Sequence, residues 1–491
     1  MAEEYVSQLP EVATTDDISG KLGVQAIVNP DDYHLEKVEI LTAGGPVNLR
    51  GVMVELSYYE DIFRGTMSGY VLIHDAISII DRQALNGTEL LSIEYKKSSQ
   101  GSFRFKKKFR VFRVGERILN NNSQEVYTLH FCSEELFLSE QMKISKAFTG
   151  TQISDIVYNI LNQEMKIDPN KNDKKALLVE STLGVYDFII PYKKPFEAIN
   201  WLSTYARPLR NPGADFMFYE NVDGLNFRSL QTLYSQQPYR TFVYNLRTAG
   251  DRGLSGEVGN SLIGIKSYNF LDTFDTLYGT NLGAFANKVI SIDPLTRRYY
   301  TTVFDYSEYT KKAKTLNGNP VISANKNVLG KTAFQNENAV LKVLTTNKDQ
   351  KKAAGISGVA PHSVANDVGV ETYVPNRTAQ LAMSHYSRIK LSISGDPSIT
   401  IGDTINVILP SMRSSDGTGY QSGQKDEYHS GKYIITAVRH IIDVNMKYET
   451  ILEIAKDSLE RSLPLNKNGT NLSNNNLNSS APVSGGVTRN N

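Results

Sequence analysis

His130 and Cys132 are the residues of this sequence whose types and spacing best suit covalent chemistry. They lie two positions apart, in and just after the alternating run EVYTLHF (125–131), so their side chains share one face of a predicted strand. A histidine beside a thiol is the arrangement that activates a cysteine nucleophile. Such a short pair is informative only within a specific family motif, and we therefore interpret it as part of a core.

Other motifs for catalysis or cofactor binding are missing from the sequence. The seven histidines form no H-x-x-x-H pair, a single cysteine cannot build a zinc site, and neither a G-x-S-x-G elbow nor a calcium loop occurs. The glycine-rich segment 250–259 does not open a helix after a strand, which favours a linker over a phosphate cradle. His440 alternates with Val438 and Ile442, which predicts a half-buried structural histidine. We expect no catalytic residue, no metal, no cofactor and no enzymatic activity.

A basic stripe is the one charge pattern with a definite geometry. The segment SFRFKKKFRVFRV (102–114) alternates, with Phe103, Phe105, Phe109 and Val111 on one face of a strand and Arg104, Lys106, Lys108 and Arg110 on the other. Four like charges on one face require water, acidic partners or phosphates nearby. We interpret the stripe first as a solvated face and second as a surface for an acidic neighbouring subunit. Nucleic acid comes third, because the aromatic side chains lie on the opposite face.

The composition predicts a mostly β protein. The 491 residues include 27 tyrosines and 19 phenylalanines, which suit half-buried strands. A net charge of +1 argues against nucleic-acid binding over the whole surface. One cysteine permits no internal disulfide, which fits folding in a reducing cytoplasm. The acidic N-terminus lacks signal-peptide features, and no apolar run is long enough to predict a membrane span.

Changes of pattern along the chain divide it into six parts. Strand patterns precede residue 133, and an apolar stripe at helical spacing follows in 153–161. A second helix is expected from Pro195, and a hairpin around Asp223-Gly224. The expected parts are an N-terminal arm (1–35), a first β region (36–132), an α+β insert (133–235), a β-rich peripheral part with a long polar segment (236–375), a second β region (376–460) and an Asn/Ser-rich tail (461–491).

The segment SGDPSITIGDTINVILP (394–410) is the most regular stretch of the second β region. Two tight turns, Gly395-Asp396-Pro397 and Gly402-Asp403, alternate with apolar side chains. We expect a hairpin with a short strand between the turns, and a second hairpin around Asn445. The first segment contains no residues suited to catalysis, which favours a structural role.

Four segments together resemble the baseplate hub proteins of contractile-tailed phages, which are related to the hub part of type VI secretion spike proteins. The segments are 54–76, 151–161, 187–206 and 388–457. In that family the last module reads as strand, G-x-P turn, short strand, G-D turn, strand ending in proline, variable loop and closing hairpin. The residues at those places here are Gly395, Pro397, Gly402, Asp403, Pro410 and Gly431.

The resemblance implies a fold, an assembly and a set of partners. Each hub subunit carries two tube-like antiparallel β-barrel domains, here the two β regions, and a homotrimer forms a pseudo-sixfold ring. The ring joins a threefold central spike to the sixfold tail tube, templates tube assembly, and passes the tape measure protein and then DNA. Implied partners are the spike, a tail tube or tube-initiator protein and baseplate wedge or inner-baseplate proteins, with no membrane. The implied location is the tail baseplate of a virion assembled in the host cytoplasm.

Two other functions stay open from the residues alone. A tail-associated cell-wall hydrolase could hold a carboxylate site within 133–235 or 308–375. A sugar-binding tail protein would need an exposed groove lined by tyrosines and Trp201, although we expect Trp201 to pack on its own helix.

Overall fold

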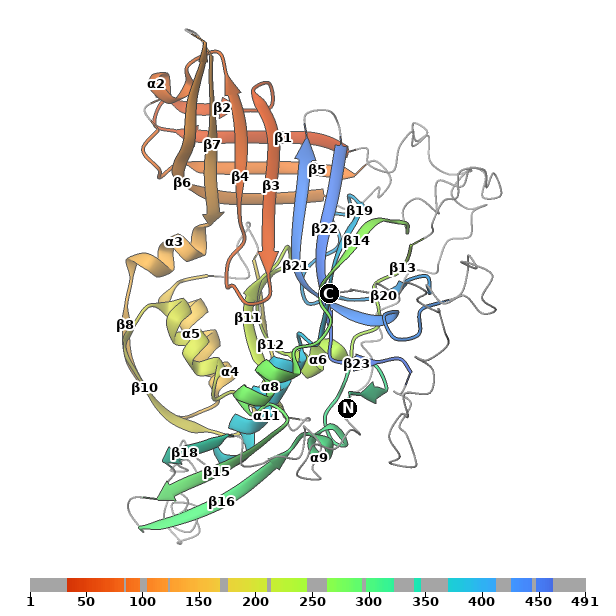
Figure 1. Cartoon of the computed structure of the whole chain (residues 1–491). Helices are drawn as coiled ribbons and strands as arrows, with labels where there is room; N and C mark the ends of the chain where they lie inside the picture. Colours follow the sequence, from red (N-terminus) through yellow and green to blue (C-terminus); the bar gives the residue numbers. More distant parts are fainter. Residues whose placement is uncertain are drawn as a thin grey trace, which may run out of the picture.

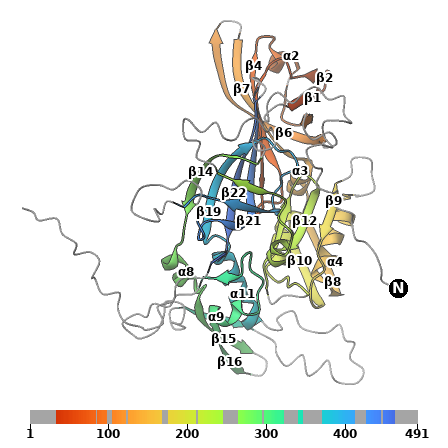
Figure 2. The ribbon, with the colours of Figure 1, turned by 90° about the vertical axis from the view of Figure 1, so that its right-hand side faces the viewer.

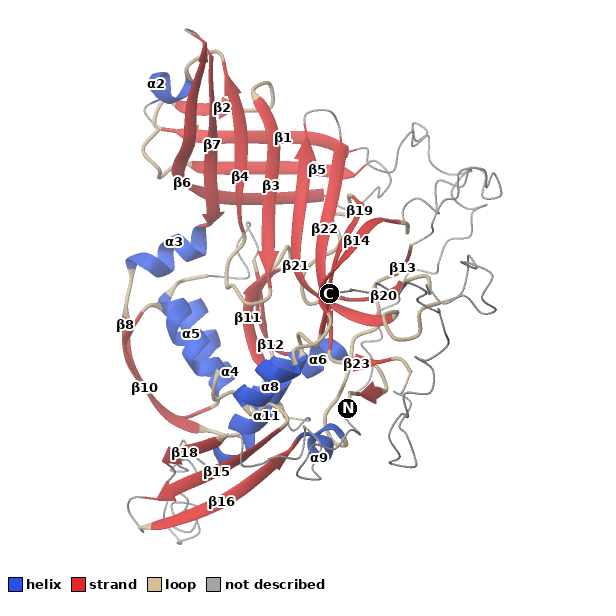
Figure 3. Ribbon diagram, in the orientation of Figure 1, coloured by secondary structure: helices blue, strands red, loops and turns tan. Residues whose placement is uncertain are grey.

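The computed structural model describes residues 33–83, 85–97, 104–121, 124–167, 175–209, 213–244, 263–293, 297–321, 340–345, 370–411, 425–443 and 447–461. Strands dominate it (Figure 3), which confirms the mostly β, α+β class. Almost all of the predicted arm, the tail and much of the polar segment lie outside the described residues.

The first β region folds around one core. Its elements are β1 (Tyr33–Thr42), β2 (Gly45–Asn48), β3 (Met53–Asp61), β4 (Ser68–Asp75), α2 (Ile79–Gln83), β5 (Leu90–Lys97), β6 (Arg104–Asn121) and β7 (Gln124–Ser133). The long strand β6 pairs with β5 through residues 104–110 and with β7 through residues 109–121. The sheet therefore turns a corner, and β1 and β5 cross β3 and β4 in Figure 1. Phe105, Phe109 and Val111 point into the core, as the alternation predicts.

The second β region also contains one long strand, β21 (Gly431–Asp443), that pairs with different strands along its length. Its other elements are β13 (Thr241–Val243), β14 (Ile265–Asp272), β19 (Ser387–Ser394), β20 (Thr404–Ile408) and β22 (Lys447–Lys456). The start of β21 pairs with β20, and β21 and β22 form the hairpin predicted around Asn445. The boundaries differ from those predicted, because β13 and β14, expected in the peripheral part, pair with β20 and β19.

A seam between β3 and β21 joins the two regions into one 13-stranded sheet. The antiparallel register runs from Asp61 opposite Ala437 to Glu55 opposite Asp443. The main path of the sheet is β14-β19-β22-β21-β3-β4-β7-β6-β5-β1-β2. Figure 1 shows β3, β21 and β22 side by side at the middle of this path. The two β regions are thus continuous through backbone hydrogen bonding.

The predicted hairpin at 394–410 is wrong. β19 pairs with β14 and β22, whereas β20 pairs with β13 and β21, so the two strands that flank the turns are not partners. Residues 395–403 form turns without the expected short strand. The reason is packing. Ile399 and Ile401 are buried in the core of the second β region, and a carboxylate from β3 takes the hydrogen bonds that a strand partner would take.

The insert between the two regions has its own core. Its elements are α3 (Glu134–Gln141), β8 (Ile144–Thr151), α4 (Ile153–Asn159), the π-helical turn η1 (Ile160–Glu164), β9 (Ala176–Val179), β10 (Tyr186–Lys193), α5 (Pro195–Ser203), β11 (Phe216–Glu220), β12 (Gly224–Ser229) and α6 (Leu230–Tyr234). The predicted stripe of 153–161 is fully buried. The hairpin predicted at Asp223-Gly224 is confirmed as β11 and β12.

A small peripheral unit lies at the end of the molecule opposite the first β region (Figures 1 and 2). It contains α8 (Thr276–Leu282), β15 (Ala286–Asp293), β16 (Arg298–Asp305), α9 (Tyr306–Thr310), β17 (Asn319–Pro320), β18 (Leu341–Thr345), α11 (Val370–Met383) and β23 (Ser458–Leu459). The strands β16, β15 and β18 form a sheet in that order. Helix α11 packs on β15 and β16.

Candidate functional site

The inner side of the seam holds a hydrogen-bonded aromatic cluster. The hydroxyls of Tyr58 and Tyr95 lie 2.5 Å apart, and those of Tyr95 and Tyr448 lie 3.2 Å apart. Tyr448 also bonds Nδ1 of His440 at 2.7 Å, and His440 stacks on Tyr58. His440 is fully buried, not half-buried as predicted, because the pairing of β3 with β21 covers it. Burial lowers the pKa of His440 to about 3, so the cluster is neutral.

The first predicted turn of the hub module lies beside this cluster. Gly395 follows β19 directly, and a Cβ there would meet the Tyr448 ring at 2.2 Å. Pro397 is buried in the same turn. Between them, Asp396 accepts hydrogen bonds from Arg240 at 3.1 Å and from the hydroxyl of Tyr239 at 3.2 Å. The first turn therefore closes against the seam.

The second turn docks on β21. The Gly402 amide donates to the Ile435 carbonyl at 3.0 Å, and the Ile435 amide donates to the Asp403 carbonyl at 2.9 Å. Gly402 has a φ of +84°, which favours glycine. Pro410 forms an isolated bridge with Lys425, and Gly431, with a φ of +123°, opens β21.

Glu60 of β3 connects the two β regions through its side chain. Its Oε2 accepts the Thr400 hydroxyl at 2.5 Å and the Ile401 amide at 3.2 Å. Burial raises the pKa of Glu60 to about 7, although these two hydrogen bonds act in the opposite direction. Lys107 lowers this pKa and Glu220 raises it. The sequence analysis missed Glu60, but the alternation of β3 places it on the buried face with Leu56 and Tyr58.

Lys107 is a second residue that the sequence analysis missed. It lies between Phe105 and Phe109 on the inward face of β6, and its Nζ donates to the Asn221 carbonyl at 3.5 Å. Burial lowers the pKa of Lys107, with neighbouring Lys175 acting in the same direction. The sequence does indicate its unusual position, because Lys107 interrupts the apolar face of the alternating segment 102–114.

Buried ion pairs lie within the insert, next to the first β region. Lys175 pairs with both Glu135 and Glu220. Glu220 also accepts the Met67 amide at 3.1 Å. Breaking one partner of such a group leaves an uncompensated buried charge, which is strongly destabilising. The Glu220–Met67 hydrogen bond connects this charged group to the first β region.

The predicted basic stripe is partly neutralised by neighbouring carboxylates. Lys106 lies 3.2 Å from Glu94, and Arg110 pairs with Glu134. Lys106 and Lys108 are exposed on the outward face of β6. Arg104 begins β6, and its side chain lies outside the described part. The carboxylates that pair with Lys106 and Arg110 come from this chain, and the role of the stripe as a partner surface stays a prediction.

The outer side of the seam is polar and salt-bridged. Arg439 of β21 bonds Glu55 at 3.2 Å and the hydroxyl of Tyr70 at 3.0 Å, so one side chain connects β21 with β3 and β4. A groove of about 660 Å³ runs along this face, lined among others by Asp61, Lys390 and Glu453. Its charges are mixed, and its wall crosses the seam from one region to the other.

The geometry does not support catalysis by His130 and Cys132 or sugar binding by Trp201. Burial raises the pKa of Cys132 to about 11, so its thiol stays protonated, and His130 bonds Arg113 at 3.0 Å. Trp201 packs edge-on against Phe188 and Tyr205. Within the described ranges, no group of three His, Cys, Asp or Glu side chains could hold a metal ion. In the same ranges, no helix is long and apolar enough to cross a membrane.

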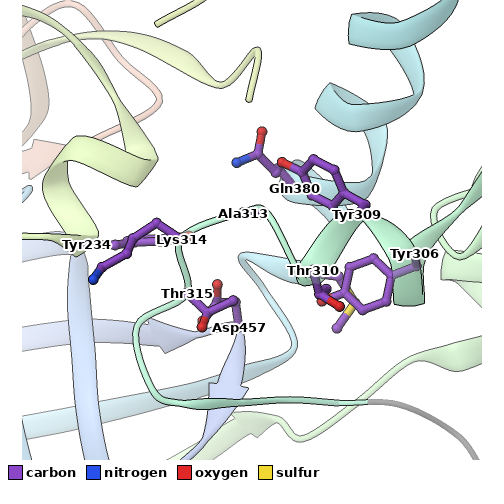
Figure 4. A pocket seen from close by; sticks show the side chains of 10 residues that line it. Tyr234, Tyr306, Tyr309, Thr310, Ala313, Lys314, Thr315, Gln380 and Asp457 are labelled. Atoms are coloured by element: carbon purple, nitrogen blue, oxygen red, sulfur yellow. The ribbon is translucent and has the colours of Figure 1, made fainter. Parts of the chain in front are cut away.

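A small cavity behind α9 is enclosed by tyrosines and Asp457 (Figure 4). Its volume of about 20 Å³ is enough for about one water molecule. Tyr234, Tyr306 and Tyr309 line it, and Tyr309 accepts a hydrogen bond from Gln231 at 3.1 Å. We interpret it as a packing defect between α6, α9, α11 and Asp457, which follows β22, and not as a ligand site.

Comparison with curated proteins finds a phage protein that is similar over most of this chain. A probable baseplate hub protein, gp334 of Vibrio phage KVP40, is 21% identical over 445 residues, which cover 88% of this chain and 96% of that protein. The resemblance to phage baseplate hub proteins is confirmed. No family model matches the chain.

Solved structures of tail proteins are also similar to this chain. A tail protein from Neisseria meningitidis MC58 has 11% identity and a TM-score of 0.47, covering 88% of this chain and 100% of that one. A 43 kDa tail protein of prophage MuSo2 from Shewanella oneidensis has 8% identity and a TM-score of 0.48, covering 86% and 99%.

The closeness of Gly395 to the Tyr448 ring predicts a stability effect. Gly395→Ala should lower the free energy of unfolding by about 1–3 kcal/mol, because Tyr448 is held by Tyr95 and His440 and cannot move away. Chemical denaturation followed by tryptophan or tyrosine fluorescence measures this. Gly51→Ala, where a Cβ meets open space, is the matched control. Equal stability of the two variants would contradict the tight turn.

The buried Glu60 carboxyl predicts a pH dependence. Its folded pKa of about 7 lies above the ordinary 4.5, so the folded state keeps a proton that the unfolded state loses, and stability falls as pH rises from about 4.5 to 7. Glu60→Gln, which keeps the acceptor, should remove up to about 3 kcal/mol of this fall. Urea midpoints from pH 5 to 8 measure it.

Asp61→Asn is the control for this experiment, because Asp61 lies on the solvent side of the same strand. It should keep the pH dependence of the parent protein. A Glu60→Gln variant with the slope of the parent would rule out Glu60 as the group responsible.

Proposed function

We propose that this chain is a structural baseplate hub of a contractile phage tail, a trimeric adaptor that joins a threefold spike to a sixfold tail tube. The observation that carries the proposal is the row of eight neighbouring strands centred on the seam. Four strands, β21, β22, β19 and β14, lie on one side of it, and four, β3, β4, β7 and β6, lie on the other. Each copy supplies two four-stranded halves, so three copies supply six. The homologous baseplate hub protein supports the same role.

The two ends of this row support ring closure. Beyond residue 110, β6 pairs with β7 alone among the described strands, and β14 is the edge strand at the other end. Exposed apolar side chains mark both ends: Ile118 and Leu119 are 62% and 64% exposed, and Phe270 and Leu271 are exposed on β14. An interface between two different ends of identical chains is heterologous, and it closes into a ring when the rotation fits. Three copies would close it here.

The polar outer side of the seam suits a channel wall. The opposite side of the eight-stranded row is buried under β5, β20 and the core clusters, so the salt-bridged face of Arg439 and Glu453 is the one available to a bore. Positive and negative side chains are both present on this face, so contact with DNA would release few counterions. Since counterion release drives non-specific DNA binding, DNA would pass without binding tightly. The tape measure protein and then DNA would use this channel.

The remaining partners follow from the position of the ring. A central spike would bind one rim, a tail tube or tube-initiator protein the other, and wedge or inner-baseplate proteins the periphery. The location is the tail baseplate of the virion, in line with the homologous protein. The role is structural, with no reaction assigned to any residue.

The proposed ring predicts a trimer that depends on both edges. The purified chain should have three times the mass of 54.8 kDa in light scattering or native mass spectrometry. Ile118→Glu and Leu271→Glu should each weaken association at least tenfold, because a buried charge replaces an apolar contact at the edge. Ile189→Glu, on the exposed face of β10 in the insert, should leave the trimer intact. A monomeric parent, or trimers of unchanged strength in both edge variants, would refute the ring.

A further inference from the structure

The three-stranded sheet of the peripheral unit has an apolar face that nothing in the described structure covers. Register places six apolar side chains on this outer face: Ile290 and Ile292 of β15, Tyr299 and Val303 of β16, and Leu341 and Val343 of β18. Tyr299 is 74% exposed, and Val303, Leu341 and Val343 are each more than half exposed. The other face is buried, with Val289 and Phe304 directed toward α11. Exposed apolar faces of this kind mark interaction sites.

Two cations lie beside the outer face. Lys288 lies in the row of Val303 and Leu341, and Arg297 directly precedes β16, two positions before Tyr299. Neither has an ion-pair partner in the part of the chain that the structure describes, whereas many cations of the 13-stranded sheet are paired. Two copies meeting through this face would bring these like charges together, which disfavours a self-interface. The occupant must be apolar and acidic.

The N-terminal arm, defined here as residues 1–32, has this chemistry. It contains seven acidic residues and one lysine, and its stretch EEYVSQLPEV (3–12) places Tyr5, Val6, Leu9 and Val12 among Glu3, Glu4 and Glu11. The other long segments outside the described residues do not fit. Segments 322–339, 346–369 and 462–491 each carry more lysine and arginine than aspartate and glutamate, and segment 245–262 is balanced.

The arm is also long enough. It ends at Tyr33, where β1 begins, so residue 12 lies 21 residues away and can reach about 70 Å in extended form. A compact chain of 491 residues has a radius of gyration of about 23 Å. The outer face and β1 lie at opposite ends of the molecule in Figure 1, and the arm can span that separation.

We propose that residues 3–12 of the arm dock on the outer face of β16, β15 and β18. The apolar side chains cover Tyr299, Val303 and Val343, and the glutamates lie against Lys288 and Arg297. The edge strand β16 offers backbone groups for pairing with an extended segment. The arm thereby ties the first β region to the peripheral unit. This contact does not depend on the proposed function.

Photo-crosslinking of the full-length protein tests this contact. With p-benzoylphenylalanine at Tyr299, ultraviolet light followed by peptide mass spectrometry should give crosslinks to residues 1–32. Mixing isotopically light and heavy copies tells whether the arm comes from the same chain or from a neighbour, and both results support the proposal. No crosslink, or crosslinks mainly to 322–339, 346–369 or another part of a second copy, would overturn it.

Charge reversal sharpens the test. Lys288→Glu with Arg297→Glu should reduce the crosslink yield at least tenfold, and Glu3→Lys with Glu4→Lys should do the same from the arm side. Combining all four changes should restore the yield. Arg82→Glu, an exposed arginine of α2, is the control and should leave the yield unchanged. Unchanged yields in both double variants would show that charge does not hold the arm. The trimer measured above is an independent readout, so failure of the ring and failure of the docking are distinguishable.

Discussion

The pairing of β3 with β21 is the interaction on which the rest of the structure depends. It connects residues 55–61 with residues 437–443 and converts two β regions into one sheet. Its register decides which side chains face inward, because a shift by one residue would turn Glu60 and His440 to solvent and Arg439 into the core. Every feature assigned to the candidate site lies within a few strands of it. The seam therefore fixes both the geometry and the chemistry of the two faces.

The two sides of the seam use polar groups in different ways. On the inner side, hydrogen bonds connect three tyrosines and the Nδ1 of a neutral histidine without ionic charge, while Glu60 Oε2 reaches across to the turn at Thr400. On the outer side, Arg439 and Glu55 form a partly exposed ion pair. Buried hydrogen bonds favour one arrangement, since alternative packings would leave these polar groups unpaired. These hydrogen bonds explain how β3 and β21 keep a single register within a sheet whose inner face is mostly apolar.

Local patterns were sufficient for much of the fold. The alternation in β6, the helical stripe of α4 and the hairpins at Asp223-Gly224 and Asn445 each follow from short-range periodicity and turn chemistry. The resemblance to hub proteins likewise came from turns such as Gly395 and Gly402. What sequence reasoning could not supply was pairing between distant strands. The hairpin expected at 394–410 failed because Glu60, more than 300 residues away, takes the hydrogen bonds of Thr400 and Ile401.

The distance between the seam strands along the chain has a consequence for synthesis. About 380 residues separate β3 from β21, as the Arg439–Ser57 contact illustrates. At about 5–20 residues per second, a ribosome needs roughly 20–80 s to make that interval, and the edge of β3 has no native partner until then. Unpaired edges attract other strands. A nascent chain therefore carries an unpaired edge on β3 for most of its translation, and the 13-stranded sheet is complete only after β21 has been made.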